Sequence, residues 1–182
     1  YTRVDGDFHA FSAKSIVLAT GGITRVWSVC SGSWEYTGDG HALALWAGAE
    51  LRDMEFVQFH PTGMVWPPSV RGILVTEGVR GEGGRLTNSE GQRFMFDYVP
   101  EMFAGDHAET IEESDQWVEE VVSGKLATVR RPPELLTRDV VAKAINSEVK
   151  AGRGSPHGGA FLDISHRCLL YTSDAADESR GV

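Results

Sequence analysis

Long apolar runs are missing from this sequence of 182 residues. Its longest apolar stretches, at residues 16–20 and 42–49, are much shorter than the ~20 residues that a helix needs to cross a bilayer. We therefore expect no membrane-spanning helix. With 41% hydrophobic and 24% charged residues, the composition is that of a soluble globular protein. A chain of this length can bury roughly 70% of its unfolded surface.

Cysteine and positive charge are also scarce. The two cysteines, Cys30 and Cys168, are far apart and form no C-x-x-C pair, so they support neither a disulfide framework nor a zinc site. We expect a reducing compartment and no metal. Lys and Arg number 17 against 26 Asp and Glu, for a net charge of −9. This balance argues against binding to a nucleic-acid duplex, and we expect no nucleic-acid partner.

Glycine, by contrast, is abundant, with 21 residues that gather in clusters. Such clusters indicate backbone placed close to a ligand. Residues 15–19 form an apolar run that leads through Thr20 into Gly21 and Gly22, which predicts a buried strand entering a glycine turn. Open α/β sheets bind ligands at this end of their strands, although a tight turn without a ligand fits the same residues.

The remaining pattern predicts a mixture of helices and short extended segments. A helix is expected over residues 40–48, capped near Asp39, and another over residues 137–152, capped by Thr137. The other expected elements are an extended segment at 50–59, a short strand at 73–76, an irregular turn at 78–84, and a hairpin within 85–97 that turns at 88–91.

Three segments differ from the rest in composition. Residues 101–120 carry many acidic side chains and no Lys or Arg, so we interpret about 101–130 as a solvated, partly helical insertion. The sequence begins without an initiator Met or a signal segment, which predicts an internal fragment of a longer protein. The polar residues 168–182 are unlike those before them and are expected to be an unrelated tail.

Candidate functional side chains gather between residues 60 and 80, with one more at 138. His60 is presented on a turn, where its ring can bind a carboxylate or only the backbone. Glu77 and Arg80 follow Thr76 in an alternation of acids and guanidinium groups, which forms either a structural ion-pair network or a proton relay. Arg138 lies at a helix start, where a cation is mildly disfavoured. A bound dicarboxylate would offset this cost, and so would the neighbouring aspartate.

A set of motifs in this order resembles the flavoprotein subunit of succinate dehydrogenase and fumarate reductase, with an acidic insertion like that of the actinobacterial type. The matching runs are L-A-T-G-G (18–22), T-G-D-G (37–40), Q-F-H-P-T-G (58–63), L-V-T-E-G-V-R-G-E-G-G (74–84), G-Q-R-F-M (91–95) and R-D-V-V-A-K-A-I (138–145).

The resemblance implies an oxidoreductase that interconverts succinate and fumarate by hydride transfer between a C–H bond and N5 of FAD. It implies that His60, Thr76 and Glu77 bind the substrate carboxylates, and that Arg138 exchanges a proton with the substrate, with Glu77 and Arg80 as the relay. It also implies that Thr20, Gly21, Gly22 and Asp39 contact FAD. An arginine acts as a base only if its proton moves on quickly, because its ordinary pKa is above 12.

The resemblance further implies an α/β fold class: part of a Rossmann-like FAD-binding domain at residues 1–57, then an α+β capping domain at 58–167. Membrane anchors and an iron–sulfur subunit are the implied partners, at the cytoplasmic face of the cell membrane. The family's G-x-G-x-x-G segment, its histidine for covalent FAD and its later substrate ligands lie outside this sequence. We therefore expect this chain alone to bind FAD weakly and not to turn over.

Two other interpretations remain open at this stage. L-aspartate oxidase shares the F-V-Q-F-H-P-T and R-G-E-G runs, although Gly63, Gly78 and the spacing between T-G-D-G and Q-F-H-P-T-G favour the first interpretation. A non-catalytic α/β binding module, in which the Arg and Glu cluster is only structural, is the second alternative.

Overall fold

The computed structural model describes residues 9–167. The chain divides into two compact units, Tyr1–Met54 and Glu55–Val182. The expected tail at 168–182 and Cys168 lie outside the described residues. The assignment of the two parts of the chain to an FAD-binding and a capping domain stays a prediction.

The first unit contains the short 3-10 helix η1 (Thr24–Val26) and the helix α1 (Asp39–Trp46). The expected helix at 40–48 is therefore confirmed. Its N-cap is Gly38 with a φ of 87°, one residue before the expected Asp39. Glycine suits this position because the left-handed backbone conformation is strained for other residues.

The strand expected at residues 15–19 is wrong. These residues form no strand, and Ile16 and Val17 are 77% and 89% exposed. A buried parallel strand requires hydrogen-bonded neighbours on its edges, and the described part of this unit contains no strand that could supply them. The extended segment at 50–59 likewise forms no strand.

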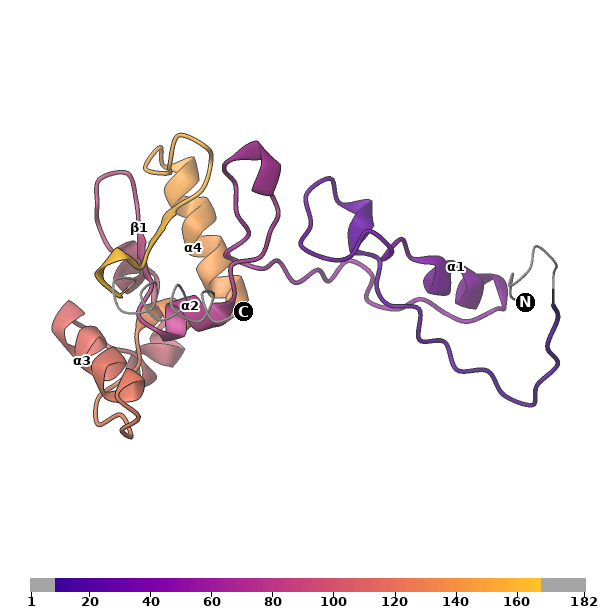
Figure 1. Cartoon of the computed structure of the whole chain (residues 1–182), viewed down its shortest axis with the longest axis horizontal. Coiled ribbons are helices and arrows are strands. Elements are labelled where there is room, and N and C mark those ends of the chain that lie inside the picture. The colour runs from indigo at the N-terminus through magenta and orange to yellow at the C-terminus, as the bar shows by residue number, and fades with distance from the viewer. Residues whose placement is uncertain (1–8, 168–182) are drawn as a thin grey trace, which may run out of the picture. The chain divides into compact units, whose positions relative to one another are not determined.

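The second unit packs helices against a two-stranded antiparallel sheet (Figure 1). Strands β1 (Arg85–Thr87) and β2 (Phe161–Asp163) pair with Leu86 opposite Leu162. The other elements are η2 (Pro68–Val70), α2 (Glu77–Gly81), η3 (Phe94–Tyr98), η4 (Glu101–Asp106), α3 (Ile111–Val122), η5 (Pro133–Leu135) and α4 (Arg138–Lys150).

Three local expectations in this unit need correction. Residues 73–76 form only an isolated bridge between Gly63 and Leu74, not a strand. Residues 77–81 form the helix α2 rather than an irregular turn. The side chain of Thr76 explains this helix, because its Oγ1 accepts a hydrogen bond from the amide of Gly78 at 3.2 Å and caps the N-terminus.

The expected hairpin is also wrong, although its turn exists. Oδ1 of Asn88 accepts hydrogen bonds from the amides of Glu90 and Gln92 at 3.1 and 3.0 Å. After this turn the chain enters η3, and β1 pairs with the distant β2 instead. The reason is that the consecutive residues Phe94 and Met95 are both fully buried, whereas successive side chains of a strand point to opposite faces.

The core of the unit lies where η3 and α4 meet the sheet. Apolar side chains on one face of α4, from Val141 and Ala144, pack with those of β1 and η3, as the helical spacing expected at 137–152 requires. The core residues are Leu86, Phe94, Met95, Leu136, Val141 and Ala144. Each such buried side chain contributes about 1.5–3 kcal/mol of hydrophobic stabilisation when it is large.

The acidic segment is partly helical, as expected, but one face of α3 is packed rather than solvated. Ser114 and Val118 are buried, and Glu113 accepts two hydrogen bonds from the guanidinium of Arg130, at 2.8 and 3.0 Å. Cations from outside the acidic run therefore balance part of its charge. None of the helices in residues 9–167 is both long and apolar enough to cross a membrane.

A buried carboxylate ties α4 to the Asn88 turn. Glu148 is 2% exposed and accepts hydrogen bonds from Asn88 at 2.9 Å, from Tyr98 at 2.7 Å and from two nitrogens of Arg153 at 2.9 and 2.7 Å. The hydrogen bond from Arg153, with those from Asn88 and Tyr98, lowers the pKa of Glu148 from 4.5 to about 2 despite its burial.

We expect Glu148→Gln to lower the free energy of unfolding by about 1–3 kcal/mol at pH 7, because the neutral amide cannot accept from all four donors. The depressed pKa of Glu148 means that its contribution is present above pH 4.5 and is lost as the pH falls towards 2. Urea unfolding at several pH values measures both effects. Glu112→Gln, an exposed glutamate of α3, is the control, and an equal loss in both variants would contradict the prediction.

Candidate functional site

Arg80, on α2, carries a fully buried guanidinium group. Its side chain is 0% exposed, and NH1 donates to the main-chain carbonyl of Glu134. Its Nε and NH2 have no hydrogen-bond partner among the described residues. Burial lowers the pKa of Arg80, with the nearby charge of Arg138 acting in the same direction and that of Glu77 opposing it. A buried cation with open donors is costly in a protein interior, so this group needs an anion nearby.

Glu77 is the carboxylate that lies between two arginines. Its Oε2 is 3.8 Å from NH2 of Arg80 and 3.5 Å from Nε of Arg138. In Figure 1, α2 lies beside the first turn of α4, the two helices that carry these residues. The structure therefore brings Arg80, Glu77 and Arg138 together, with Arg80 buried and the side chains of Glu77 and Arg138 half exposed, at 50% and 44%.

His60 lies close enough to these charged groups for them to shift its pKa. Burial is the main cause that lowers the pKa of His60, and the positive charges of Arg138 and Arg80 lower it further. The negative charge of Glu77 acts in the opposite direction. Nδ1 lies 3.3 Å from the amide nitrogen of Thr62, which donates to it. Because an amide can only donate, Nδ1 is an acceptor, and the neutral ring carries its proton on Nε2. His60 thus presents an N–H donor.

The hydroxyl of Thr76 completes the set expected from the sequence. Its oxygen accepts from Gly78 while the residue itself is exposed, so its hydrogen is available to another acceptor. Arg85, by contrast, points elsewhere: its NH2 pairs with Asp115 of α3 at 2.7 Å. The alternating acids and arginines of this segment therefore separate into two groups.

Sequence reasoning missed two residues of this site. Oε1 of Gln58 accepts from NH1 of Arg138 at 3.4 Å, and Thr62 fixes the ring of His60. Oγ1 of Thr62 also donates to the carbonyl of Val75 at 2.8 Å, which joins the histidine turn to the segment before Thr76. The turn sequence H-P-T was a usable signal for Thr62, whereas no spacing relates Gln58 to a residue so distant in the chain.

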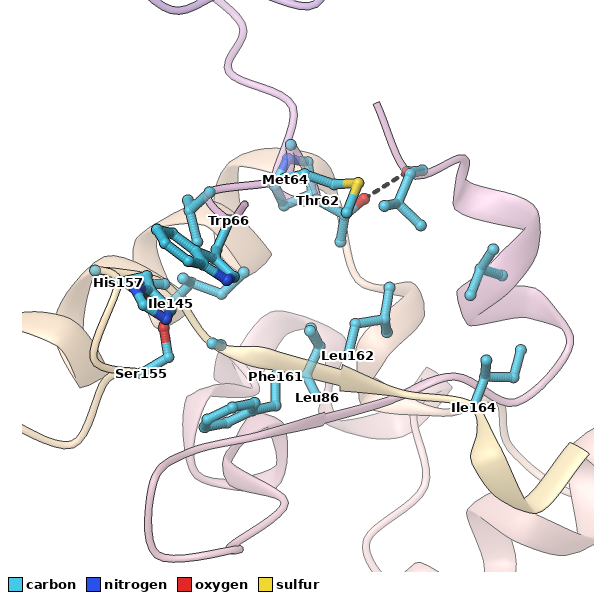
Figure 2. A pocket seen from close by; sticks show the side chains of 18 residues that line it. Thr62, Met64, Trp66, Leu86, Ile145, Ser155, His157, Phe161, Leu162 and Ile164 are labelled. Atoms are coloured by element: carbon cyan, nitrogen blue, oxygen red, sulfur yellow. Dashed lines mark hydrogen bonds between the residues drawn. The ribbon is translucent and has the colours of Figure 1, made fainter. Parts of the chain in front are cut away.

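An apolar cavity of about 560 Å³ lies beside the residues that follow His60 (Figure 2). Pro61, Thr62 and Met64 line it, together with residues of the segment that contains β2. The rings of Trp66 and His157 stack at its edge, with centroids 4.1 Å apart and planes 7° apart. Among the described residues, no group of three or more His, Cys, Asp or Glu side chains is placed to hold a metal ion.

The first unit holds the four residues expected to contact a cofactor. Gly21 has a φ of 76° and lies against the ring of Tyr36, where an added Cβ would be 2.6 Å from a ring carbon. Gly22, in contrast, has no atom within 4 Å of an added Cβ. Thr20 lies against Gly40 at the start of α1, and Oδ2 of Asp39 accepts from the hydroxyl of Thr37 at 2.7 Å.

These four residues fit a nucleotide cofactor. In the described part of the chain, the amides of Gly21 and Gly22 donate to no main-chain carbonyl. Because glycine has no side chain, these backbone N–H groups can come close to a bulky polar ligand. The first turn of α1 lies nearby, since Gly40 contacts Thr20, and helix N-termini favour anions.

Residues 2–177 match the family described as FAD binding domain. The chain belongs to this family. Its α/β character agrees with that of the family, and FAD is accordingly its cofactor. Thr20, Gly21, Gly22 and Asp39 stay the residues of this chain that are predicted to contact FAD.

Among known proteins, this FAD-binding chain is 48% identical over 157 residues to one of the subunits of the CoM/CoB fumarate reductase of Methanothermobacter marburgensis, covering 86% of this chain and 23% of that protein. It is 38% identical over 164 residues to the succinate dehydrogenase flavoprotein subunit of Rickettsia bellii, covering 89% of this chain and 22% of that protein. The chain thus spans about a quarter of the length of these relatives.

Solved structures give the same result. Sdh1 of Mycobacterium smegmatis in complex with UQ1 is 58% identical, with a TM-score of 0.55 over 86% of this chain and 21% of that chain. FrdA of the E. coli quinol fumarate reductase is 36% identical, with a TM-score of 0.60 over 90% of this chain and 26% of that chain. The recognition of this family from the sequence motifs is therefore confirmed.

We expect ring ¹⁵N NMR of histidine-labelled protein to show His60 neutral at pH 7 and protonated on Nε2, because the pKa of His60 is lowered and Nδ1 accepts from Thr62. The chain has six histidines, so the signal is assigned by its loss in His60→Gln. A charged ring at pH 7, or a proton on Nδ1, would contradict this geometry.

We expect Gly22→Ala to weaken FAD binding in the full-length protein by about tenfold or more, about 1.4 kcal/mol. The described residues leave room for the methyl group, so a cofactor bound at this turn would meet it. Flavin absorbance per protein measures the effect. Gly105→Ala, another glycine with open space and no positive φ, should keep its flavin, and equal flavin content in both variants would remove Gly22 from the FAD site.

Proposed function

We propose that the protein containing this chain is the FAD-bound flavoprotein subunit of an enzyme that interconverts succinate and fumarate. The observation that carries the proposal is the alignment of Arg80, Glu77 and Arg138 beside His60. The similarity to proteins named fumarate reductase and succinate dehydrogenase supports it.

Substrate binding uses the donors of the site. A four-carbon dicarboxylate carries two negative charges, and the Nε2–H of His60 and the free hydroxyl hydrogen of Thr76 bind one carboxylate. The positive field of Arg138 and Arg80 favours the dianion in the same place. Preorganised donors of this kind stabilise charge that develops in the transition state without reorganising during the reaction.

Oxidation of succinate removes a hydride from one carbon and a proton from its neighbour. The chemistry that FAD would supply when bound is acceptance of the hydride. Arg138 first gives a proton to Glu77, 3.5 Å from its Nε, and the neutral guanidine then takes the proton from the substrate carbon. Arg80, on the other side of Glu77, holds the carboxylate of the relay in place. Fumarate reduction runs the same transfers backwards, so the direction depends on the electron partner.

The position of Arg138 supports this role for a group that is ordinarily a poor base. Its guanidinium has a carboxylate at 3.5 Å and the amide oxygen of Gln58 at 3.4 Å, and the buried positive charge of Arg80 acts on the same small region. Glu77 is therefore placed to take a proton from Arg138.

We further propose that residues 1–57 belong to the FAD-binding domain and residues 58–167 to a capping domain. Membrane anchors and an iron–sulfur subunit would be the partners, with this chain's protein held at the cytoplasmic face of the cell membrane through them. Relatives that are named as subunits of such enzymes support this arrangement.

We expect Arg138→Gln to reduce succinate oxidation, measured with an artificial electron acceptor in the full-length protein, by several orders of magnitude at unchanged flavin content. The amide cannot accept and pass on the proton. Lys143→Gln removes another exposed cation from the same helix, with its side chain 79% exposed, and should keep the wild-type rate.

Three results would redirect the proposal. A near-normal rate of succinate oxidation by the Arg138→Gln variant would contradict the proton-transfer mechanism. Oxidation of L-aspartate in preference to succinate by the wild-type protein would move the assignment to an aspartate oxidase with the same binding groups. Absence of both activities in flavin-loaded protein would favour a structural ion-pair cluster.

A further inference from the structure

Behind the site lies a second buried carboxylate that the reaction does not use. Glu134, on η5, has a side chain that is 0% exposed. Its Oε1 accepts from Nε of Arg93 at 2.6 Å and its Oε2 from NH2 of Arg93 at 3.1 Å. Such a two-point pair between a guanidinium and a carboxylate fixes orientation as well as distance.

Arg93 is itself anchored on its far side. Its NH1 donates to Asp115 at 3.1 Å and its NH2 to the hydroxyl of the buried Ser114 at 2.5 Å, both on α3. Burial alone would lower the pKa of Arg93, but the hydrogen bonds and charge of Glu134 outweigh it and raise the pKa. The pair is therefore held from α3.

The main chain of Glu134 reaches the proton relay directly. Its carbonyl oxygen accepts from NH1 of Arg80, which is the one hydrogen bond that the guanidinium of Arg80 makes among the described residues. Pro132 and Pro133, immediately before Glu134, are both fully buried, and proline fixes the backbone φ angle. The carbonyl thus has a defined position, set by the prolines and by the side-chain pair with Arg93.

We propose that Glu134, held by Arg93, is a positioning residue for the relay: it fixes Arg80, and through Arg80 it keeps Glu77 in line with Arg138. This inference rests on the proposed function. The path runs from α3 through Arg93 to η5, then to α2 and finally to α4, so a packed face of the acidic insertion supports the site from behind.

The alternative is that the pair only stabilises the fold. Breaking a buried charge pair costs stability in either case, so stability cannot separate the two roles. The rate of proton transfer can separate them. A relay that is displaced by about 1 Å slows proton transfer by up to about 100-fold, while the binding groups, His60 and Thr76, stay in place. The proton transfer then limits turnover, and the rate becomes more sensitive to deuterated solvent.

The test compares Glu134→Gln and Arg93→Lys with wild type in the full-length, flavin-loaded protein, by succinate oxidation in H₂O and in D₂O. We expect kcat to fall about 10–100-fold, KM to stay within about threefold, and the solvent isotope effect on kcat to rise. Arg93→Lys keeps the buried positive charge but not the two-point geometry, so it is the variant to measure if Glu134→Gln fails to fold.

Glu148→Gln is the matched control, because Glu148 is also a buried glutamate paired with an arginine, and it lies on the helix that carries Arg138. It should lose stability with no change in kcat or in the solvent isotope effect. Wild-type kcat and isotope effect in the Glu134 and Arg93 variants would overturn the proposal. So would a joint fall in kcat and flavin content with an unchanged isotope effect, which marks a structural role.

The two proposals fail in different ways. If wild-type protein oxidises succinate and Arg138→Gln does not, the proposed function stands and only the Glu134 result decides the present inference. If wild-type protein does not oxidise succinate, or Arg138→Gln keeps its rate, the relay itself is wrong and the inference falls with it.

Discussion

The guanidinium of Arg80, buried without a full set of partners, is the constraint on which this site depends. A buried charge costs several kcal/mol unless opposite charge and hydrogen bonds compensate for it. Here one donor reaches a main-chain carbonyl and the nearest carboxylate, Glu77, stands 3.8 Å away. The group is thus held firmly on one side and loosely on the other. That asymmetry suits a group that must influence a neighbouring carboxylate rather than neutralise it.

Two buried glutamates in the second unit hold different segments together. Glu148 closes the Asn88 turn onto α4 and is saturated with donors, whereas Glu134 faces Arg93 with its side chain and Arg80 with its main chain. Both carboxylates are buried in the unit whose apolar core is formed around Phe94, Met95 and Val141. The core sets the distance between α4 and η3, and the polar pairs fix the orientation of the segments between them.

In the described part of the first unit, a local turn and a helix start form although no strand pairs beside them. Its glycine turn and the start of α1 are in contact through Gly40 and Thr20, although the apolar run before them is largely exposed. The turn and the helix start therefore form from local interactions, without a sheet. A strand does not, because its hydrogen bonds and its buried faces come from other strands.

The motifs of the sequence determined the family, the cofactor and the helices α1 and α4, because capping residues, apolar spacing and glycine turns act within a few residues of each other. They also named Arg80, Glu77 and Arg138, which the tertiary structure brings together. Only the tertiary structure decided that β1 pairs with β2, that residues 15–19 stay unpaired, that Gln58 reaches Arg138, and that Glu134 and Arg93 lie behind Arg80. These are contacts between distant segments, and they depend on which side chains are buried together rather than on any local pattern.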